Sequence, residues 1–301
     1  MKKLIVITGP TASGKTGLAV ELAKRLSADV LSADSRQFFK EMSIGTAKPT
    51  VQEMDDVAHH FVGHISIHES YTVGQYERDV MNLLNRYFKE NDHAILVGGS
   101  GLYIKAICEG LDDFPEIEEE KRTFVRESYE TMGLNWLQDQ IKEKDPVYYR
   151  QVDIQNPQRL MRALEVIESS GKPFSSFLHI DKTPREFEIL KFAIQWDRAT
   201  LYNRINLRVD QMLEAGLLNE VQSLVSFKHL NALQTVGYTE LFDYFDDRYD
   251  IAEAVRLIKR NTRRYAKRQL TWFRRELDMN WISSDLSRSR MIDEILRSLI
   301  K

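Results

Sequence analysis

Short apolar runs alternate with amphipathic stretches over the first hundred residues of the chain. Residues 4–7, 30–33 and 94–97 are mainly apolar segments of four residues, a length typical of buried strands. Residues 15–26 carry a leucine at every fourth position from residue 18, which places these side chains on one face of a helix. The alternation predicts an α/β fold, with a parallel sheet and flanking crossover helices.

Residues suited to a ligand site follow closely behind the three predicted strands. They are Gly9, Asp34 and Gly98. The carboxyl ends of parallel strands share one edge of the sheet, and ligands bind in the crevice beyond that edge. The sequence therefore predicts that these three residues lie together.

The segment after the first strand has the pattern of a phosphate-binding P-loop. Gly9-Pro10-Thr11-Ala12-Ser13-Gly14-Lys15-Thr16 matches G-x-x-x-x-G-K-[ST] in full, between a predicted strand and a predicted helix. The glycines let backbone N–H groups turn toward a phosphate chain, Lys15 adds a positive charge, and Thr16 adds a hydroxyl for Mg²⁺. The pattern predicts a diphosphate or triphosphate site formed by these residues.

A carboxylate, Asp34, follows the second strand and is expected to face the phosphate site. Strand-end carboxylates of P-loop proteins hold Mg²⁺ or position a catalytic water. The tripeptide Ala33-Asp34-Ser35 could also begin a helix, where the same side chain would serve only as an N-cap. The local pattern leaves both interpretations open.

The strand pattern stops near residue 113 and returns close to residue 189. Between 116 and 183 the apolar spacing is helical, and Asn156-Pro157 suits a helix N-cap followed by the first helical position. We therefore predict a P-loop NTPase-like catalytic core of residues 1–112 and 193–301, interrupted by a helical insertion domain of residues 113–192.

Charged residues are unevenly distributed, although the formal net charge is only −3. Residues 109–120 contain seven acidic and no basic side chains, and residues 256–275 contain nine basic and no acidic ones. A helix over the second segment would present a basic stripe of Arg256, Arg260, Arg263, Lys267 and Arg274. Such a stripe is often only a solvated face. Cations without nearby acids repel one another, however, which favours an RNA backbone site.

The remaining composition is typical of a soluble intracellular protein. Cys108 is the only cysteine, which excludes an internal disulfide framework and suits a reducing compartment. The first apolar run is too short for a signal peptide or a membrane span. We expect no contact with a membrane.

Motifs spread over nearly the whole chain resemble those of the bacterial tRNA dimethylallyltransferases, also called tRNA isopentenyltransferases. In the family's order they are the P-loop, Ser32-Ala33-Asp34-Ser35-Arg36-Gln37, Gly45-Thr46-Ala47-Lys48-Pro49, His59-His60-Phe61, Gly98-Gly99-Ser100-Gly101-Leu102-Tyr103, Asn156-Pro157-Gln158-Arg159, Gly171-Lys172-Pro173 and Val236-Gly237-Tyr238. Two departures concern tRNA preference more than the reaction. Ser100 stands where the family more often has threonine, and Arg36 where it often has methionine.

The resemblance implies a reaction as well as a fold. A dimethylallyl group would pass from its diphosphate to the exocyclic N6 amine of the adenosine immediately 3′ of the tRNA anticodon, with release of diphosphate. The P-loop would hold the diphosphate, with Mg²⁺ at Thr16. Asp34 would accept the proton of the amine, Thr11 would hydrogen-bond the bridging oxygen, and Arg208 would stabilise the departing charge.

The same resemblance implies a surface that binds the anticodon stem-loop of tRNA. The residues it assigns to tRNA contact are Asp34, Ser35, Arg36, Gln37, Ser100, Arg122, Gln158, Arg159, Leu160, Met161 and Arg162. The basic stripe adds Arg256, Arg260, Arg263 and Lys267. We expect a cytoplasmic monomer whose partners are tRNA and dimethylallyl diphosphate.

Three other functions could use the same P-loop. A small-molecule kinase would bind ATP there, an isopentenyltransferase could act on free adenine nucleotides, and an RNA-binding protein could use a nucleotide as a switch. The helical insertion and the basic stripe disfavour the first two, because small substrates need no large RNA-binding surface.

Overall fold

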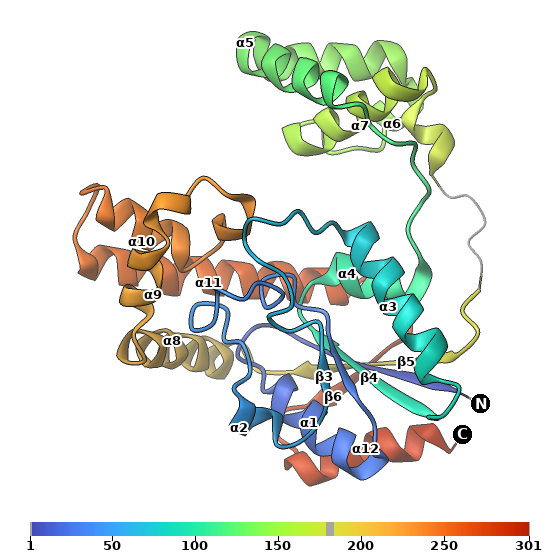
Figure 1. The fold of residues 1–301 in the computed structure, drawn as a ribbon, viewed down its shortest axis with the longest axis vertical. Coiled ribbons are helices and arrows are strands. Elements are labelled where there is room, and N and C mark those ends of the chain that lie inside the picture. The colour runs from blue at the N-terminus through green and yellow to red at the C-terminus, as the bar shows by residue number, and fades with distance from the viewer. Residues whose placement is uncertain (1, 179–183, 301) are drawn as a thin grey trace. The chain divides into compact units, whose positions relative to one another are not determined.

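The computed structural model describes residues 2–178 and 184–300, which form two compact units (Figure 1). The core unit comprises Met1–Glu109 and Arg185–Lys301, and the helical unit comprises Gly110–Pro184. The sequence predicts an insertion that extends to residue 192, whereas the structure ends it earlier. Strand β5 begins at Glu188, within the predicted insertion, and pairs with β1 of the core unit.

The core unit is built on a six-stranded parallel sheet in the order β3-β2-β4-β1-β5-β6. The strands are β1 (Lys3–Thr8), β2 (Val30–Ser32), β3 (His59–His60), β4 (His93–Gly98), β5 (Glu188–Gln195) and β6 (Met279–Ser283). The predicted α/β fold with a parallel sheet is therefore confirmed. The P-loop strand β1 lies between β4 and β5.

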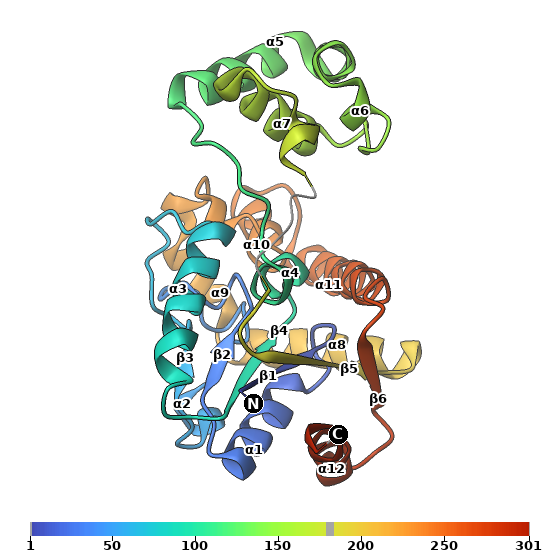
Figure 2. The same cartoon turned by 90° about the vertical axis from the view of Figure 1, so that its right-hand side faces the viewer.

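Helices cover both faces of this sheet (Figure 2). Leucines of α1 and isoleucines of α12 pack on one face, while α3, α4, α8 and α11 contribute to the apolar cluster on the other. The bounds are α1 (Lys15–Leu26), α2 (Val51–Met54), α3 (Val73–Tyr87), α4 (Gly101–Glu109), α8 (Arg198–Glu214), α9 (Leu217–Ser223), η2 (Val225–Phe227), η3 (Asn231–Leu233), α10 (Tyr238–Phe245), α11 (Ile251–Phe273) and α12 (Arg288–Leu299). Across 2–178 and 184–300, no helix combines the length and the apolar character that crossing a membrane requires.

The carboxyl ends of β1, β2 and β4 meet closely at one edge of the sheet. A Cβ atom on Gly98 would lie 2.2 Å from the backbone oxygen of Ala33, so only glycine allows this approach. The Thr8 hydroxyl donates to the Gly98 carbonyl at 3.0 Å. Gly9 and Asp34 thus follow, and Gly98 ends, strands whose carboxyl ends are in contact, so the three residues lie together as the strand pattern predicts.

The helical unit has its own apolar core. Its helices are α5 (Glu119–Lys144, kinked at Gly133), α6 (Pro146–Tyr149), α7 (Pro157–Ser170) and η1 (Phe174–Phe177). The Asn156 side chain accepts from the Arg159 N–H and caps α7, as predicted, and Gly171 ends this helix in a left-handed conformation. The buried Asp145 carboxylate joins α6 to η1 by accepting from Tyr148 and Ser175.

Candidate active site

The P-loop connects β1 to α1 in a conformation that leaves hydrogen-bond donors open. Gly9 and Gly14 have φ of 152° and 86°, and Ala12 is left-handed at 62°. Within residues 2–178 and 184–300, no side chain caps the N-terminus of α1 at Gly14, so its first N–H groups are available to an anion. The Ser13 hydroxyl is buried and has no hydrogen-bond partner among the residues that the structure describes. Such an arrangement suits a phosphate group.

Side chains that follow β5 hold this loop in place. The indole Nε1 of Trp196 donates to the Ser13 carbonyl at 3.0 Å, and Nε of Arg204 donates to the Ala12 carbonyl at 2.9 Å. The Arg204 guanidinium also stacks 4.4 Å from the centre of the Trp196 ring. Arg204 therefore supports the loop, whereas Arg208, one helical turn further on, has no such bond and faces the cleft.

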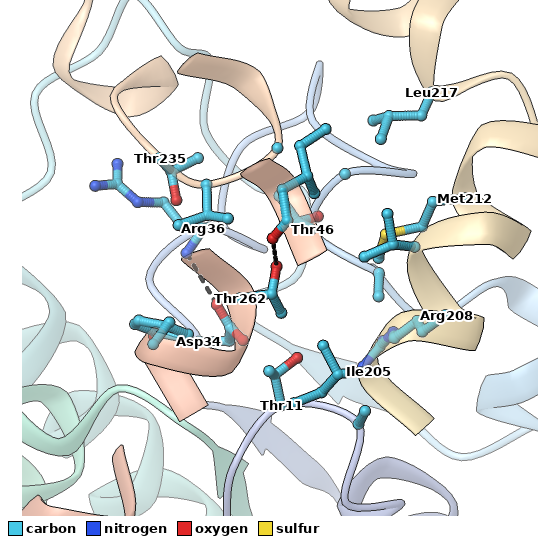
Figure 3. Close-up of a pocket in the computed structure, with 18 of the residues that line it drawn as sticks. Thr11, Asp34, Arg36, Thr46, Ile205, Arg208, Met212, Leu217, Thr235 and Thr262 are labelled. Carbon is cyan, nitrogen blue, oxygen red and sulfur yellow. Dashed lines mark hydrogen bonds between the residues drawn. The ribbon is translucent and has the colours of Figure 1, made fainter. Parts of the chain in front are cut away.

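Two cavities meet at the P-loop. The phosphate cleft, of about 630 Å³, is lined by residues 11–17, Arg204, Arg208 and Arg288. The apolar cavity, of about 110 Å³, has an apolar lining of Ile205, Val209, Met212, Leu217, Val236 and Ile258. Thr11, Lys15, Asp34 and Arg208 border both. Asp34, Arg36 and Thr235 lie on one side of the apolar cavity, and Met212 and Leu217 lie opposite (Figure 3).

Positive charge is concentrated where the two cavities join. Burial lowers the pKa of Lys15 to about 8, opposed by the attraction of the Asp34 carboxylate and assisted by the nearby Arg208 guanidinium. Burial also lowers the pKa of Arg208. The two confined cations, Lys15 and Arg208, thus border the same cavities as one carboxylate, that of Asp34. An anion in the phosphate cleft would restore the balance of charge.

Asp34 follows β2 and stands at this junction. Its Oδ1 accepts from the Arg36 N–H at 3.1 Å, so it caps the turn that begins there. Within the part of the chain that the structure describes, Oδ2 has no recorded hydrogen bond. The structural and the chemical interpretations of this residue are therefore compatible, because the two oxygens can have different tasks.

The neighbouring motif residues mostly bond to the protein itself. Gln37 donates to the carbonyls of Thr46 and Ala47, at 3.2 and 3.1 Å, and so holds a loop that borders both cavities. The Ser100 hydroxyl lies 3.1 Å from the Ser35 N–H, from which it accepts. Arg36 donates to the carbonyls of residues 231 and 232, both at 2.9 Å. The resemblance assigns these side chains to tRNA contact, but their hydrogen bonds show that they also hold the loops of the site in place.

A third pocket, which we call the basic mouth, lies beside Arg36 and Tyr265. Both residues also border the apolar cavity. The mouth has a volume of about 520 Å³ and is lined by Ser35, Arg36, Gln234, Thr235, Val236, Thr239, Glu240, Asn261, Arg264, Tyr265 and Arg268. The basic stripe prediction omits Arg264 and Arg268. Both belong to the basic run at 256–275, which was the signal that could have found them.

The predicted stripe on α11 is only partly available to a partner. Lys267 is exposed, but Arg256 makes an ion pair with Glu253 at 2.6 Å and Arg263 donates to Asn206 at 2.6 Å. The premise that no acid lies near the stripe is therefore wrong for Arg256, because Glu253 precedes the segment and lies one turn away on the same helix. Lys259 is also paired, with Asp210 of α8.

Within the helical unit, several predicted tRNA-contact residues gather at one pocket. Arg122, Gln158, Met161 and Arg162 line it together with Glu119, Thr123, Arg126 and Glu165. Arg159 is exposed on the same helix. Leu160 is a correction to the sequence prediction. Its side chain is fully buried in the apolar core of this unit, so it stabilises α7 and is not accessible to RNA.

The chain is similar in sequence to known proteins of one family. The model of the IPP transferase family matches residues 37–276. The tRNA dimethylallyltransferase of Flavobacterium johnsoniae is 48% identical over 305 aligned positions, which cover 99% of this chain and 99% of that protein. The protein of the same name from Christiangramia forsetii is 49% identical, with 97% of each chain covered.

Solved structures of similar proteins also have a similar fold. The full-length tRNA isopentenylpyrophosphate transferase of Bacillus halodurans matches 100% of this chain and 96% of its own, with a TM-score of 0.75 and 35% identity. A eukaryotic dimethylallyltransferase acting on tRNA matches 94% of this chain and 74% of its own, with a TM-score of 0.81 and 25% identity.

Proposed function

This chain belongs to the IPP transferase family, and we propose that its phosphate cleft and apolar cavity hold the two parts of dimethylallyl diphosphate. As an enzyme of this family, it transfers a dimethylallyl group to tRNA. The observation that carries the proposal is the junction of the two cavities. There, confined cations and open N–H groups adjoin an apolar space, with a carboxylate at the boundary.

The P-loop residues, from Gly9 to Thr16, bind the diphosphate. Open N–H groups at the start of α1, the Ser13 hydroxyl, Lys15 and Arg208 all meet the phosphate cleft. They neutralise the charge that grows on the diphosphate as the allylic C–O bond breaks, and Thr11 donates to the bridging oxygen. Because these groups are fixed before the reaction, they stabilise the leaving group without reorganisation.

We further propose that Mg²⁺ accompanies the diphosphate. No cluster of three or more His, Cys, Asp or Glu side chains among the described residues could hold a metal. The Thr16 hydroxyl and the Asp34 carboxylate border one small recess beside Lys15. The Thr16 hydroxyl suits Mg²⁺, which takes few protein ligands and binds mainly through water and substrate phosphates, while the Asp34 carboxylate is kept for the proton of the amine. When bound, the ion would add positive charge beside the leaving diphosphate.

Asp34 acts on the other reactant, the adenosine. The N6 amine attacks the allylic carbon, so a C–N bond forms as the C–O bond to diphosphate breaks. The lone pair of this amine is delocalised into the purine, which makes it a weak nucleophile. Asp34 Oδ2 accepts its proton during the attack, while Oδ1 keeps its bond to the Arg36 N–H.

The adenosine reaches this point from the basic mouth. Arg36 and Tyr265 border both the mouth and the apolar cavity, so a base that enters there passes an aromatic ring and meets Asp34. Arg264 and Arg268 at the mouth and Lys267 beside them suit the phosphates of an anticodon stem-loop. Arg122, Gln158, Arg159 and Arg162 of the helical unit offer a second set of contacts. We propose that the enzyme works as a monomer in the cytoplasm, where tRNA is available.

Incubation with labelled dimethylallyl diphosphate and unmodified tRNA tests this function. Label is expected in tRNA, at the adenosine 3′ of the anticodon, and diphosphate is expected in equal amount. ATP in place of dimethylallyl diphosphate, and AMP in place of tRNA, serve as controls. Phosphate transfer from ATP would support the kinase alternative, and label in AMP would support an enzyme of free nucleotides.

The affinity for dimethylallyl diphosphate is expected to fall as the pH rises through about 8 in the absence of tRNA. The pKa of Lys15 lies at about 8, so its ammonium is present below this pH and is lost above it. Since bound diphosphate favours the charged form, each pH unit above 8 should weaken binding by up to about tenfold. Calorimetric titrations between about pH 7 and 9.5 measure the trend. In Lys15→Met, the affinity should be low and the trend absent, and a flat profile in the wild type would contradict the assignment.

A further inference from the structure

Gln269, on the inner face of α11, bonds directly to the P-loop. Its side chain is 6% exposed, although it borders the apolar cavity. Oε1 accepts from the Thr11 N–H at 2.9 Å, and Nε2 donates to the Gly99 carbonyl at 2.9 Å. One buried amide thus links the loop after β1 to the loop after β4.

The bond to Gln269 occupies one backbone N–H group of the P-loop, that of Thr11. Backbone N–H groups of such loops turn toward the phosphates. Here the N–H of Thr11 instead donates to Gln269. The absence of a side chain at Gly99 makes room for the amide of Gln269, because a Cβ atom on Gly99 would lie 2.3 Å from Nε2. The Thr11 backbone is therefore fixed by a side chain that lies 258 positions away in the sequence.

We propose that Gln269 is a positioning residue that fixes Thr11 for departure of the diphosphate. This inference rests on the proposed function, in which the Thr11 hydroxyl donates to the bridging oxygen. Few rotatable bonds separate the Thr11 hydroxyl from the backbone. The position of the hydroxyl therefore depends on the position of the Thr11 backbone, which Gln269 fixes. Loss of the bond displaces the hydroxyl from the bridging oxygen but leaves Lys15, Arg208 and the open N–H groups of α1 to bind the substrate.

The expected signature is a fall in kcat with little change in KM. Gln269→Met keeps the length of the side chain and removes both hydrogen bonds. It should lower kcat by about 10–10²-fold, which is the effect of a reacting group displaced by about 1 Å. KM for dimethylallyl diphosphate should stay within about threefold, because the leaving-group contact acts in the transition state. Thr271→Val is a matched control, since it removes a hydrogen bond of α11 that stays within the helix, and its kcat should be unchanged.

A double-mutant cycle separates positioning from general support of the fold. Thr11→Ala should lower kcat by about 10²-fold. If Gln269 acts through Thr11, Gln269→Met should lower kcat by no more than about threefold when Thr11 is already alanine. Full additivity of the two losses would overturn the proposal. Absence of any tRNA prenylation by the wild type would instead overturn the proposed function.

Gln269→Glu keeps the inference testable should Gln269→Met fail to fold. A protonated glutamic acid can accept from the Thr11 N–H and donate to the Gly99 carbonyl, as glutamine does, whereas the carboxylate cannot donate. The ratio of the kcat of this variant to that of the wild type should therefore rise as the pH is lowered. A constant ratio would count against the role of the paired bonds.

Discussion

Asp34→Asn is expected to lower kcat by about 10²–10⁴-fold, the range that a general base contributes. The amide cannot accept the proton of the attacking amine. Its oxygen can still accept from the Arg36 N–H, which Asp34 does at 3.1 Å, so the turn after β2 should persist. The variant therefore separates the chemical task of this side chain from its structural one. The affinity for dimethylallyl diphosphate should remain that of the wild type.

Single-turnover rates with both substrates saturating measure the chemical step directly. Asp29→Asn is a suitable control, because Asp29 lies just before β2, at the opposite end of the strand from Asp34, where its carboxylate bonds to His60. It should transfer the dimethylallyl group at a normal rate. Near-normal turnover of Asp34→Asn would remove this residue from the role of base and leave it as the cap of a turn.

Replacement of Arg260, Arg264, Lys267 and Arg268 by glutamine is expected to weaken tRNA binding by about 10²–10³-fold at about 0.15 M salt. Each cation that contacts a phosphate releases counterions, which contributes about 0.7–0.9 to the slope of log affinity against log salt. Glutamine has a high helix propensity, so α11 should remain intact. The variant keeps Arg256, which pairs with Glu253, and Arg263, which donates to Asn206 of α8, and it includes Arg264 and Arg268 because they line the basic mouth.

The salt slope is the decisive measurement for this surface. A control with the same loss of charge replaces Lys24, Arg25, Arg290 and Arg297, four exposed residues of α1 and α12, with glutamine. The control should keep its slope, so an equal decrease in both would indicate a general effect of net charge. The loss should be similar for good and poor tRNA substrates, because phosphate contacts carry no sequence information. An unchanged slope in the α11 variant would mean that this face only meets solvent.

The local parts of the site were predictable from the sequence, because their geometry depends on neighbouring residues. A strand, a glycine-rich loop and a helix in succession specify a P-loop. Asp34 comes shortly after the next strand, so its place at the same edge of the sheet could be predicted. The caps of α7 are likewise encoded by Asn156, Pro157 and Gly171. These features need no knowledge of how distant segments pack.

The rest depends on contacts between segments far apart in the chain. Gln269 and Tyr265 reach the site only because α11 packs beside the P-loop, and no local pattern marks them. The basic run at 256–275 includes Arg268 but does not show that this side chain lines the mouth. A motif comparison transfers whole segments, so it included Leu160, which faces the core of the helical unit. The basic run spans residues 256–275, so the prediction leaves out Glu253, which forms an ion pair with Arg256.

The order of strands in the sheet has a consequence for the synthesis of the protein. β1 pairs with β4 on one side and with β5 on the other, and the ends of β4 and β5, Gly98 and Gln195, are 97 positions apart in the sequence. At about 5–20 residues per second, a ribosome needs about 5–20 s to make that stretch. The contiguous helical unit can fold during this interval. Meanwhile one edge of β1 has no partner, and such an edge can pair with other chains. The insertion thus delays the pairing of β1 with β5 and lengthens the time for which this edge of the nascent sheet is open to other chains.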